Sequence, residues 1–246
     1  ARNYDMQHGV YWGENDGAAD PSFTLNQIDW TNNNNSPSTT GPNATFVTDI
    51  DGDGDLDVVV AYGMGRLIVW YENDGASDPS FSAAQTIHNN TPYGTTSIYA
   101  EDMDRDGDMD LIASMSTDLY WYENDGASNP SWNIQLLDSG SSAGSVIVKD
   151  LDLDGDMDIV RGSANGTIVW YTNNGASNPS WSLIVVESGV SDRPWNVSVS
   201  DMDSDGDFDI VVSFMDNSSG IVWYENNGTT TGWSKNTVTI TTGQQR

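Results

Sequence analysis

The chain has 246 residues, enough for one large domain or two small ones with a sizeable core. It carries 37 Asp and Glu against 8 Lys and Arg, a formal charge of −29. This negative field repels phosphate backbones and anionic lipid, so the composition argues against nucleic acid and membrane insertion and favours cations as partners. The absence of Cys excludes disulfides, thiolate metal sites and Cys nucleophiles. No apolar run approaches the ~20 residues that a membrane-spanning helix needs.

Two motifs recur in phase along the chain. The sequence Trp-Tyr-Glu-Asn, or a close variant, precedes an Asn-Asp-Gly-Ala-Ser turn or a relative of it and begins at Trp12, Trp70, Trp121, Trp170 and Trp223. The sequence Asp-x-Asp-x-Asp-Gly-Asp-x-Asp occurs four times, beginning at Asp49, Asp102, Asp150 and Asp201. Both motifs recur about every 50 residues. Such a period is typical of β-propeller blades, whose repeats span ~40–50 residues. We therefore expect one domain over residues 1–246, with repeats at about 1–30, 44–88, 96–137, 145–187 and 196–240.

Each full repeat is predicted to contain four short strands, here named a to d. In the second repeat they cover residues 44–48, 56–61, 67–72 and 81–87. They are rich in Val, Ile, Trp and Tyr, and the connections contain Gly, Asn, Asp, Ser and Pro. Strand b reads as a continuous apolar run, as expected of a sheet that is covered on both faces. The pattern predicts an all-β fold, a β-propeller of four-stranded antiparallel blades, with the repeated Trp between blades.

The two ends of the chain depart from this pattern. The N-terminal repeat is incomplete: only residues 1–5 remain for strand b, and strand a and its acidic loop are absent. The last repeat ends after strand d and supplies no spare strand. Either the four full repeats and the incomplete one form a five-bladed ring, or they are part of a larger ring. In a ring left open, a homo-oligomer or a strand-completing partner at the first repeat would cover the free edge.

The acidic loops carry the clearest chemical signal. Side-chain oxygens at loop positions 1, 3, 5 and 9, with Gly at position 6, form the hard-oxygen ligand set that suits Ca²⁺ better than Mg²⁺. The Glu at position 12 of an EF-hand is replaced by Val60, Ala113, Arg161 or Val212, so Asp at position 9 must complete the shell. Five carboxylates within nine residues repel one another unless a cation or protons neutralise them. These loops hold 20 of the 37 acidic residues.

This loop, placed between two strands and repeated about every 50 residues, resembles the FG-GAP and VCBS repeats of integrin alpha-subunit propellers, secreted bacterial proteins and a fungal propeller lectin. The resemblance implies four Ca²⁺ sites, each formed by the side chains at positions 1, 3, 5 and 9 and the main-chain carbonyl at position 7. The metal-site residues are Asp49, Asp51, Asp53, Asp55 and Asp57; Asp102, Asp104, Asp106, Asp108 and Asp110; Asp150, Asp152, Asp154, Asp156 and Asp158; and Asp201, Asp203, Asp205, Asp207 and Asp209.

Antiparallel strand order places the ab and cd connections on one face of the propeller and the bc and da connections on the other. The ab and cd connections are nearly invariant within this chain, whereas the bc and da connections differ from repeat to repeat. Variable loops on a rigid scaffold are suited to recognition. The candidate ligand-binding residues on that face are Trp30, Arg66, Tyr93, Asp192, Arg193 and Trp195.

The sequence shows no recognisable set of catalytic residues. The two histidines, His8 and His88, lie at non-equivalent positions, and no Ser/His/Asp or His-Glu-x-x-His spacing occurs. The Glu of the Trp motif recurs in phase, which favours a structural role in accepting turn amides. Arg161 stands where the equivalents are uncharged, so it either pairs with an acid between blades or extends from a strand end towards solvent.

These features predict a calcium-stabilised binding module that is extracellular, secreted or on the cell surface. Extracellular modules bind Ca²⁺ at ~10⁻⁴–10⁻³ M, a concentration that cytosol does not offer. The first residues lack the apolar core of a signal peptide, so we expect any export signal to have been removed. The expected partner is a glycan, bound in a lectin-like manner, or an extracellular protein in adhesion or assembly. The alternative is the propeller domain of a secreted polysaccharide-degrading enzyme.

Overall fold

The computed structural model describes residues 9–30, 41–63, 66–91, 94–140, 144–215 and 220–238. This part of the chain contains β-strands and no helix, and so no helix that would span a membrane. One sheet has two strands, β1 (Gly9–Asn15) and β2 (Phe23–Trp30), and four sheets have four. The four-stranded sheets contain β3 (Ala44–Thr48), β4 (Asp57–Tyr62), β5 (Leu67–Tyr71) and β6 (Gln85–Asn89); β7 (Thr95–Glu101), β8 (Asp110–Met115), β9 (Asp118–Asn124) and β10 (Trp132–Ser139); β11 (Gly144–Lys149), β12 (Asp158–Ser163), β13 (Thr167–Asn173) and β14 (Trp181–Glu187); and β15 (Pro194–Ser200), β16 (Asp209–Phe214), β17 (Ile221–Glu225) and β18 (Ser234–Val238).

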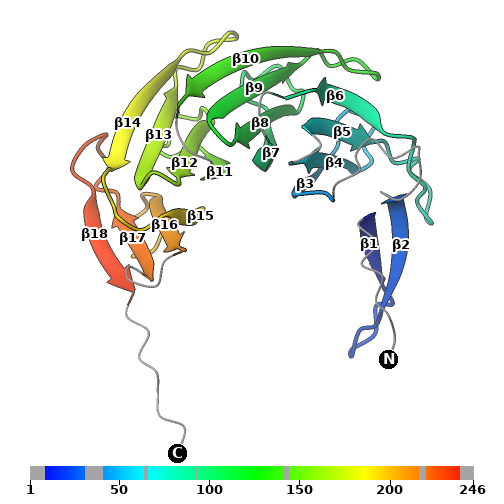
Figure 1. Ribbon diagram of the computed structural model, residues 1–246, viewed down its shortest axis with the longest axis horizontal. Coiled ribbons are helices and arrows are strands. Elements are labelled where there is room, and N and C mark those ends of the chain that lie inside the picture. Colours follow the sequence, from blue (N-terminus) through cyan, green and yellow to red (C-terminus); the bar gives the residue numbers. More distant parts are fainter. Residues whose placement is uncertain are drawn as a thin grey trace, which may run out of the picture.

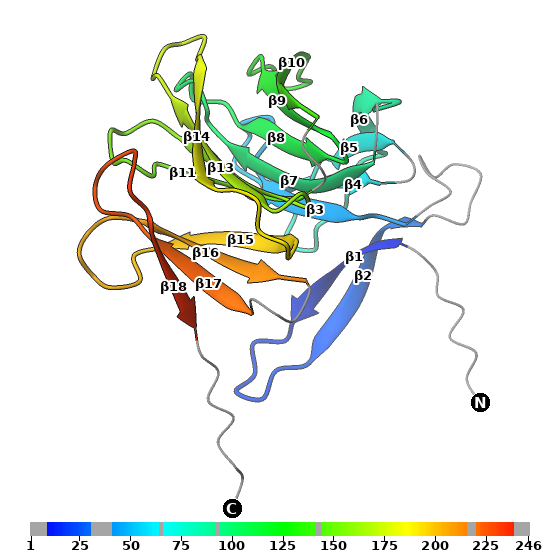
Figure 2. The ribbon, with the colours of Figure 1, turned by 60° about the vertical axis from the view of Figure 1, so that its left-hand side comes forward.

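Each four-stranded sheet is an antiparallel meander in chain order. The first strands β3, β7, β11 and β15 contact one another in sequence and line the inside of an arc, while the last strands lie on its outside (Figure 1). The β1–β2 hairpin and the β15–β18 sheet stand at the two ends of this arc (Figure 1), and a turned view shows the successive sheets rotated about a common centre (Figure 2). The predicted all-β propeller of antiparallel blades is confirmed.

The strands of the second repeat fall close to their predicted ranges, and strand d differs most. Phe81 forms only an isolated bridge with Asn73, and the continuous strand begins at Gln85. The physical reason is local: the amide of Glu72 donates to Ser82 Oγ at 3.0 Å, and the amide of Ser82 donates to the Glu72 carbonyl at 2.8 Å. Residues up to Ser82 therefore belong to the turn.

The hydrophobic core lies between blades. In β4 and β5, one set of side chains, including Val59 and Trp70, packs against the β7–β10 blade, and the alternate set, including Val60 and Tyr71, packs against the β1–β2 hairpin. Covering both faces explains the continuous apolar run of strand b. The predicted inter-blade position of the repeated Trp is confirmed in the first three complete blades, where Trp70, Trp121 and Trp170 are at most 2% exposed, whereas Trp12 of the first hairpin is partly exposed.

A recurring polar contact ties successive blades together. A Tyr on strand c meets a side chain on strand d of the preceding unit: Tyr71 with Asp29, Tyr122 with His88, and Tyr171 with Asp138, each at 2.8 Å. At the last junction Lys235 Nζ instead contacts Glu187 Oε2 at 3.0 Å. Burial raises the pKa of these tyrosines, so their hydroxyls remain protonated.

Arg161 is the one basic side chain in strand b of the four described blades. It is fully buried, and Nη1 lies 3.4 Å from Asp138 Oδ2 of the preceding blade. Its Nη2 faces the carbonyl oxygens of Met115 and Asp118, each at 3.5 Å. The predicted pairing with an acid between blades is confirmed, and extension towards solvent is excluded.

The ends of the arc leave apolar surface uncovered. Position 2 of each acidic loop inserts between blades, and Ile50, Met103 and Leu151 are 1–2% exposed, whereas the equivalent Met202 is 45% exposed. Within the described residues, β1 pairs with β2 and its other edge lacks the strand b found in each full blade. The predicted short strand at residues 1–5 lies outside the described residues. The structure thus has four complete blades and a two-stranded unit in place of a fifth.

The buried ion pair yields a stability prediction. Asp138→Ala leaves the Arg161 guanidinium buried without its carboxylate, so we expect a loss of about 3–5 kcal/mol in the free energy of unfolding, measured by urea denaturation. The double variant Asp138→Ala/Arg161→Val should recover most of this loss, because Val occupies the equivalent position in two other blades. The matched control Asp29→Ala removes the equivalent acid where no Arg depends on it. Equal losses in Asp138→Ala and Asp29→Ala would contradict the role assigned to Arg161.

Candidate functional site

The acidic loops connect strands a and b in the four complete blades. Loop position 6 is Gly54, Gly107, Gly155 or Gly206, with φ between 93° and 101°. A residue with a Cβ is strained in this region of backbone space, which explains why all four copies have Gly there. The turn directs backbone amides towards the first Asp: Gly52, Asp53 and Gly54 donate to the Asp49 carboxylate at 2.9, 3.1 and 2.9 Å.

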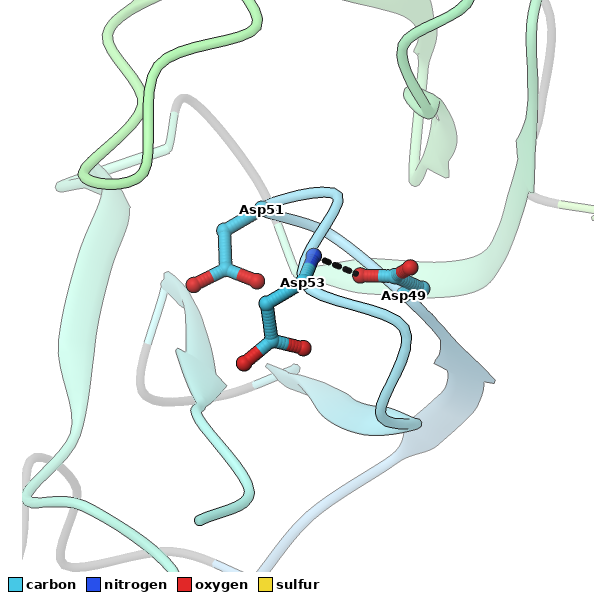
Figure 3. A group of neighbouring side chains, drawn as sticks. All are labelled: Asp49, Asp51 and Asp53. Atoms are coloured by element: carbon cyan, nitrogen blue, oxygen red, sulfur yellow. Dashed lines mark hydrogen bonds between the residues drawn. The ribbon is translucent and has the colours of Figure 1, made fainter. Parts of the chain in front are cut away.

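Each loop gathers three carboxylates. In Figure 3 the side chains of Asp51 and Asp53 project from the curled loop beside Asp49, which accepts the amide of Asp53. One oxygen from each member of a triad lies within 4.8 Å of the others. Three loops combine positions 1, 3 and 5, and the fourth combines positions 1, 3 and 9. The triads are Asp49, Asp51 and Asp53; Asp102, Asp104 and Asp106; Asp150, Asp152 and Asp154; and Asp201, Asp203 and Asp209.

This geometry fits a hard cation. Two oxygens bound to one Ca²⁺ at ~2.3–2.6 Å are separated by at most about 5 Å, which matches the spread within each triad. Three loop atoms, Asp51 Oδ1, Asp150 Oδ1 and Asp156 Oδ1, are also buried without a hydrogen-bond partner, and the last of them forms an ion pair with Arg105. A buried carboxylate oxygen without a partner carries a desolvation cost that a cation would remove.

Burial and neighbouring negative charges raise the pKa of several carboxyl groups in the acidic loops. Burial and the neighbouring Asp106 raise the pKa of Asp104 to about 6. Burial and the adjacent position-5 Asp also raise the pKa of Asp51, Asp152 and Asp203. The ionised form of the loops is therefore disfavoured until positive charge is supplied.

Position 9 has a second role. Asp110 is fully buried; its Oδ2 accepts the amide of Met103 at 3.2 Å, and its Oδ1 accepts the amide of Asn124 on strand c at 2.8 Å. The bond to the strand-c Asn also measures 2.8 Å in the other three blades. Burial raises the pKa of Asp110 and Asp158 to about 7. This carboxylate joins the loop to the blade whether or not it also contacts a cation.

The Asp at position 7 of each acidic loop faces the neighbouring cd turn. A Cβ placed on Gly75, Gly126 or Gly175 would lie 1.9–2.2 Å from a carboxylate oxygen of Asp55, Asp108 or Asp156 respectively. The turn Gly is therefore required by close approach to the acidic loop, and the ab and cd connections share one face as predicted. At the fourth loop, Asp207 lies 3.0 Å from the equivalent position on Gly228.

The repetition of the Glu in the Trp motif predicts that it accepts turn amides, and this prediction is wrong. Glu72, Glu123 and Glu225 instead accept side-chain amides from strand d, such as Asn133 Nδ2 at 2.7 Å from Glu123. The Asn that follows each Glu accepts the turn amide, because it directly precedes the turn; Asn124 Oδ1 accepts Gly126 at 3.1 Å. These Glu charges contribute to raising the pKa of the position-3 Asp in their loops, and the third loop has Thr172 instead.

A pocket of about 500 Å³ lies at the other end of the inner strands. It brings together two predicted ligand-binding residues, Arg193 and Trp195, of which Trp195 is 62% exposed. It also contains residues that sequence analysis missed. Most of them stand at or next to the residue six positions before an acidic loop, whereas Ala164 and Met215 directly follow β12 and β16. The lining residues are Asn43, Thr96, Gly144, Ser145, Ala164, Arg193, Pro194, Trp195, Asn196 and Met215.

Asp192 and Arg66, the other predicted ligand-binding residues whose side chains are described, are not among the residues that line this pocket. Asp192 directly precedes the lining residue Arg193 in the chain and is buried, at 5% exposure. Arg66 has φ 52°, and its Nε donates to the Thr91 carbonyl at 2.5 Å, so it holds the bc turn against the da connection. The side chain of Trp30 and all of Tyr93 lie outside the described residues.

The fold and the four acidic loops define a β-propeller whose blades each carry a candidate cation loop at the ab connection. A family model described as the FG-GAP-like repeat matches residues 49–113, 112–161 and 150–212, so the chain belongs to this family. A search of the curated proteins finds no match.

Two solved structures share the propeller fold. A lectin from Agrocybe aegerita, described as recognising non-reducing terminal N-acetylglucosamine, is 17% identical with a TM-score of 0.64 over 96% of this chain and 62% of its own. The BBS1 N-terminal domain, solved with ARL6, is 14% identical with a TM-score of 0.52 over 81% of this chain and 57% of its own. At these identities the likeness concerns the fold, and the chain spans about three fifths of each structure.

The contrast between loop positions 9 and 5 is testable. Asp110→Ala removes two bonds to backbone amides, so we expect a loss of about 2–4 kcal/mol in unfolding free energy both with Ca²⁺ and with excess chelator. Asp106→Ala, in the same loop, removes a triad carboxylate and should destabilise the protein mainly when Ca²⁺ is present. Urea denaturation of both variants under both conditions measures this. If chelation erased the cost of Asp110→Ala, its role in the fold would be wrong.

Proposed function

We propose that this protein is a calcium-stabilised propeller that acts outside the cell as a binding module and has a glycan as its main ligand. The observation that carries the proposal is the division between its two faces. One face carries a carboxylate triad in each of four loops, and the other holds a pocket lined by unlike residues. The first arrangement suits a scaffold ion and the second suits recognition.

In this proposal each loop holds one Ca²⁺ through the side chains at positions 1, 3, 5 and 9 and the carbonyl at position 7. The bound ion supplies positive charge that allows all loop carboxylates to ionise together. The protein provides the rest of the arrangement. Left-handed residues at positions 4 and 6 curl the loop, backbone amides orient the first Asp, and the position-9 Asp anchors the loop to strand c.

Calcium loops without the bidentate Glu of high-affinity sites suit the ~10⁻⁴–10⁻³ M range of extracellular modules, which supports secretion or surface display. Binding is favoured over catalysis because the described part of the pocket lining has no carboxylate or histidine, and His88 contacts Tyr122 between blades. A glycan array probed with the Ca²⁺-loaded protein tests the ligand class. A product assay on polysaccharides tests the alternative of an enzyme's propeller domain.

A second candidate function is self-assembly through the ends of the arc. The uncovered face around Met202 and the exposed hairpin face that carries Tyr11, Phe23 and Leu25 correspond to the two faces that pack together between neighbouring blades of the arc. A second copy of this chain could therefore supply its first hairpin to the last blade, in a head-to-tail contact. Apolar surface and an unpaired edge are features that β proteins normally cover.

The calcium proposal predicts strong dependence on the ion. Saturation at a hundredfold excess over Kd adds about 2.7 kcal/mol for each independent site. Excess chelator should therefore lower Tm by at least ~5 °C, and re-addition of Ca²⁺ should restore it. Native mass spectrometry should find four ions. Mg²⁺ at the same concentration is the control. A melting curve that chelator leaves unchanged would sink the proposal.

The assembly proposal predicts a concentration-dependent mass. Light scattering should report two or more chain masses that fall on dilution, and Met202→Lys should shift the protein to the monomer. Met215→Lys is the matched control, because Met215 is 44% exposed but lies at the pocket. A wild-type protein that is monomeric at every concentration would refute self-assembly and leave the calcium proposal intact.

A further inference from the structure

The pocket lies where four blades meet. Its lining includes the first residues of the inner strands β7, β11 and β15 and the residue just before β3. These strands contact one another around the inside of the arc (Figure 1). A neighbouring hollow of about 300 Å³ shares Asn43 and Thr96 with the pocket. The pocket volume of about 500 Å³ lies within the ~300–1,000 Å³ range of small-ligand sites.

Trp195 projects from a β-bulge. In the β15–β16 pair, Pro194 opposes Phe214 and Asn196 opposes Ser213, so Trp195 is the extra residue. A bulge removes a residue from the regular alternation and redirects its side chain. Trp195 is 62% exposed and lines the pocket, unlike the repeated tryptophans buried between blades.

Hydrogen bonds between blades hold the polar part of the rim. Asn43 Nδ2 donates to the Thr95 carbonyl at 2.7 Å, Thr96 Oγ1 donates to the Gly144 carbonyl at 3.0 Å, and Ser145 Oγ donates to Asn196 Oδ1 at 3.1 Å. Each bond joins one blade to the next. The rim groups are therefore positioned before a ligand arrives, which reduces the ordering cost of binding.

The lining chemistry narrows the ligand class. None of the described lining residues is acidic, although the chain carries a formal charge of −29, and Arg193 is the charged residue among them. Apart from the Arg193 guanidinium, the described polar side chains offer amide and hydroxyl groups, each able to exchange hydrogen bonds with a neutral hydroxyl. An exposed indole offers a flat apolar surface that matches the C–H face of a pyranose ring.

We propose that this pocket binds a neutral saccharide, with one sugar ring packed on Trp195 and its hydroxyl groups bonded to the rim formed by Asn43, Ser145 and Asn196. The inference rests on the proposed glycan-binding function and adds to it the place of the site, the class of sugar and the residue that anchors it. The four acidic loops lie at the other end of the inner strands and take no part in ligand contact.

The test uses the full chain loaded with Ca²⁺. A glycan array identifies the neutral glycan that binds best. Calorimetry then measures the affinity of this glycan for the wild-type protein and for the variants Trp195→Ala, Trp195→Phe and Phe23→Ala. Ligand-observed NMR tests binding of three chosen disaccharides, cellobiose, chitobiose and lactose. Phe23 is a matched control, an aromatic side chain that is 61% exposed on the first hairpin. We expect Trp195→Ala to weaken binding at least tenfold, with Trp195→Phe and Phe23→Ala within about threefold of wild type.

Three outcomes would overturn the inference. If Trp195→Ala binds the glycan as tightly as Phe23→Ala, the site lies elsewhere, while the glycan-binding function stands. If acidic glycans bind in preference to neutral ones, the proposed class is wrong. If neither the array nor the three disaccharides show binding to a folded wild-type protein, both the pocket assignment and the glycan-binding function fail. The melting temperature of each variant confirms that it is folded.

Discussion

The carboxylate at position 9 of each acidic loop is the interaction on which the rest of this structure depends. It is buried, and its two oxygens accept one amide from the loop and one from strand c. A buried carboxylate that lost these donors would carry a large desolvation cost. Because the same residue ends the loop and begins strand b, the loop cannot change shape without disturbing the blade. The candidate cation site is thus continuous with the fold.

The same region connects one blade to the next. Asn124, whose amide reaches the position-9 Asp, also donates from Nδ2 to the Ile50 carbonyl of the preceding blade at 2.9 Å, and Asn173 repeats this contact with Met103 at 2.8 Å. The side chains of Ile50 and Met103 fill the adjoining inter-blade core. Loading one loop with a cation would therefore stabilise two blades, as expected of a repeat protein coupled through nearest neighbours.

The two ends of the inner strands have different constraints. At the acidic end, close approach between the loop carboxylate and the turn Gly leaves no freedom to vary, since a Cβ at Gly126 would overlap Asp108. At the pocket end, corresponding positions hold Asn43, Thr96, Gly144 and Trp195, and backbone carbonyls provide several of the acceptors. Side chains there can differ without breaking the blades. A fold with one invariant and one variable face can keep its stability while its ligand changes.

The sequence by itself determined the repeat, the strand pattern, the inter-blade Trp and the acidic loops, because each depends on local spacing that recurs in the chain. It left open whether Arg161 pairs with an acid or extends towards solvent, and it did not indicate Asp138 as the partner. Tertiary structure alone decided which distant residues share a surface. Trp195 and Asn43 are separated by three blades in sequence and meet only because the inner strands converge. The strand-d partners of Glu123 likewise depend on sheet register, which motif spacing does not encode.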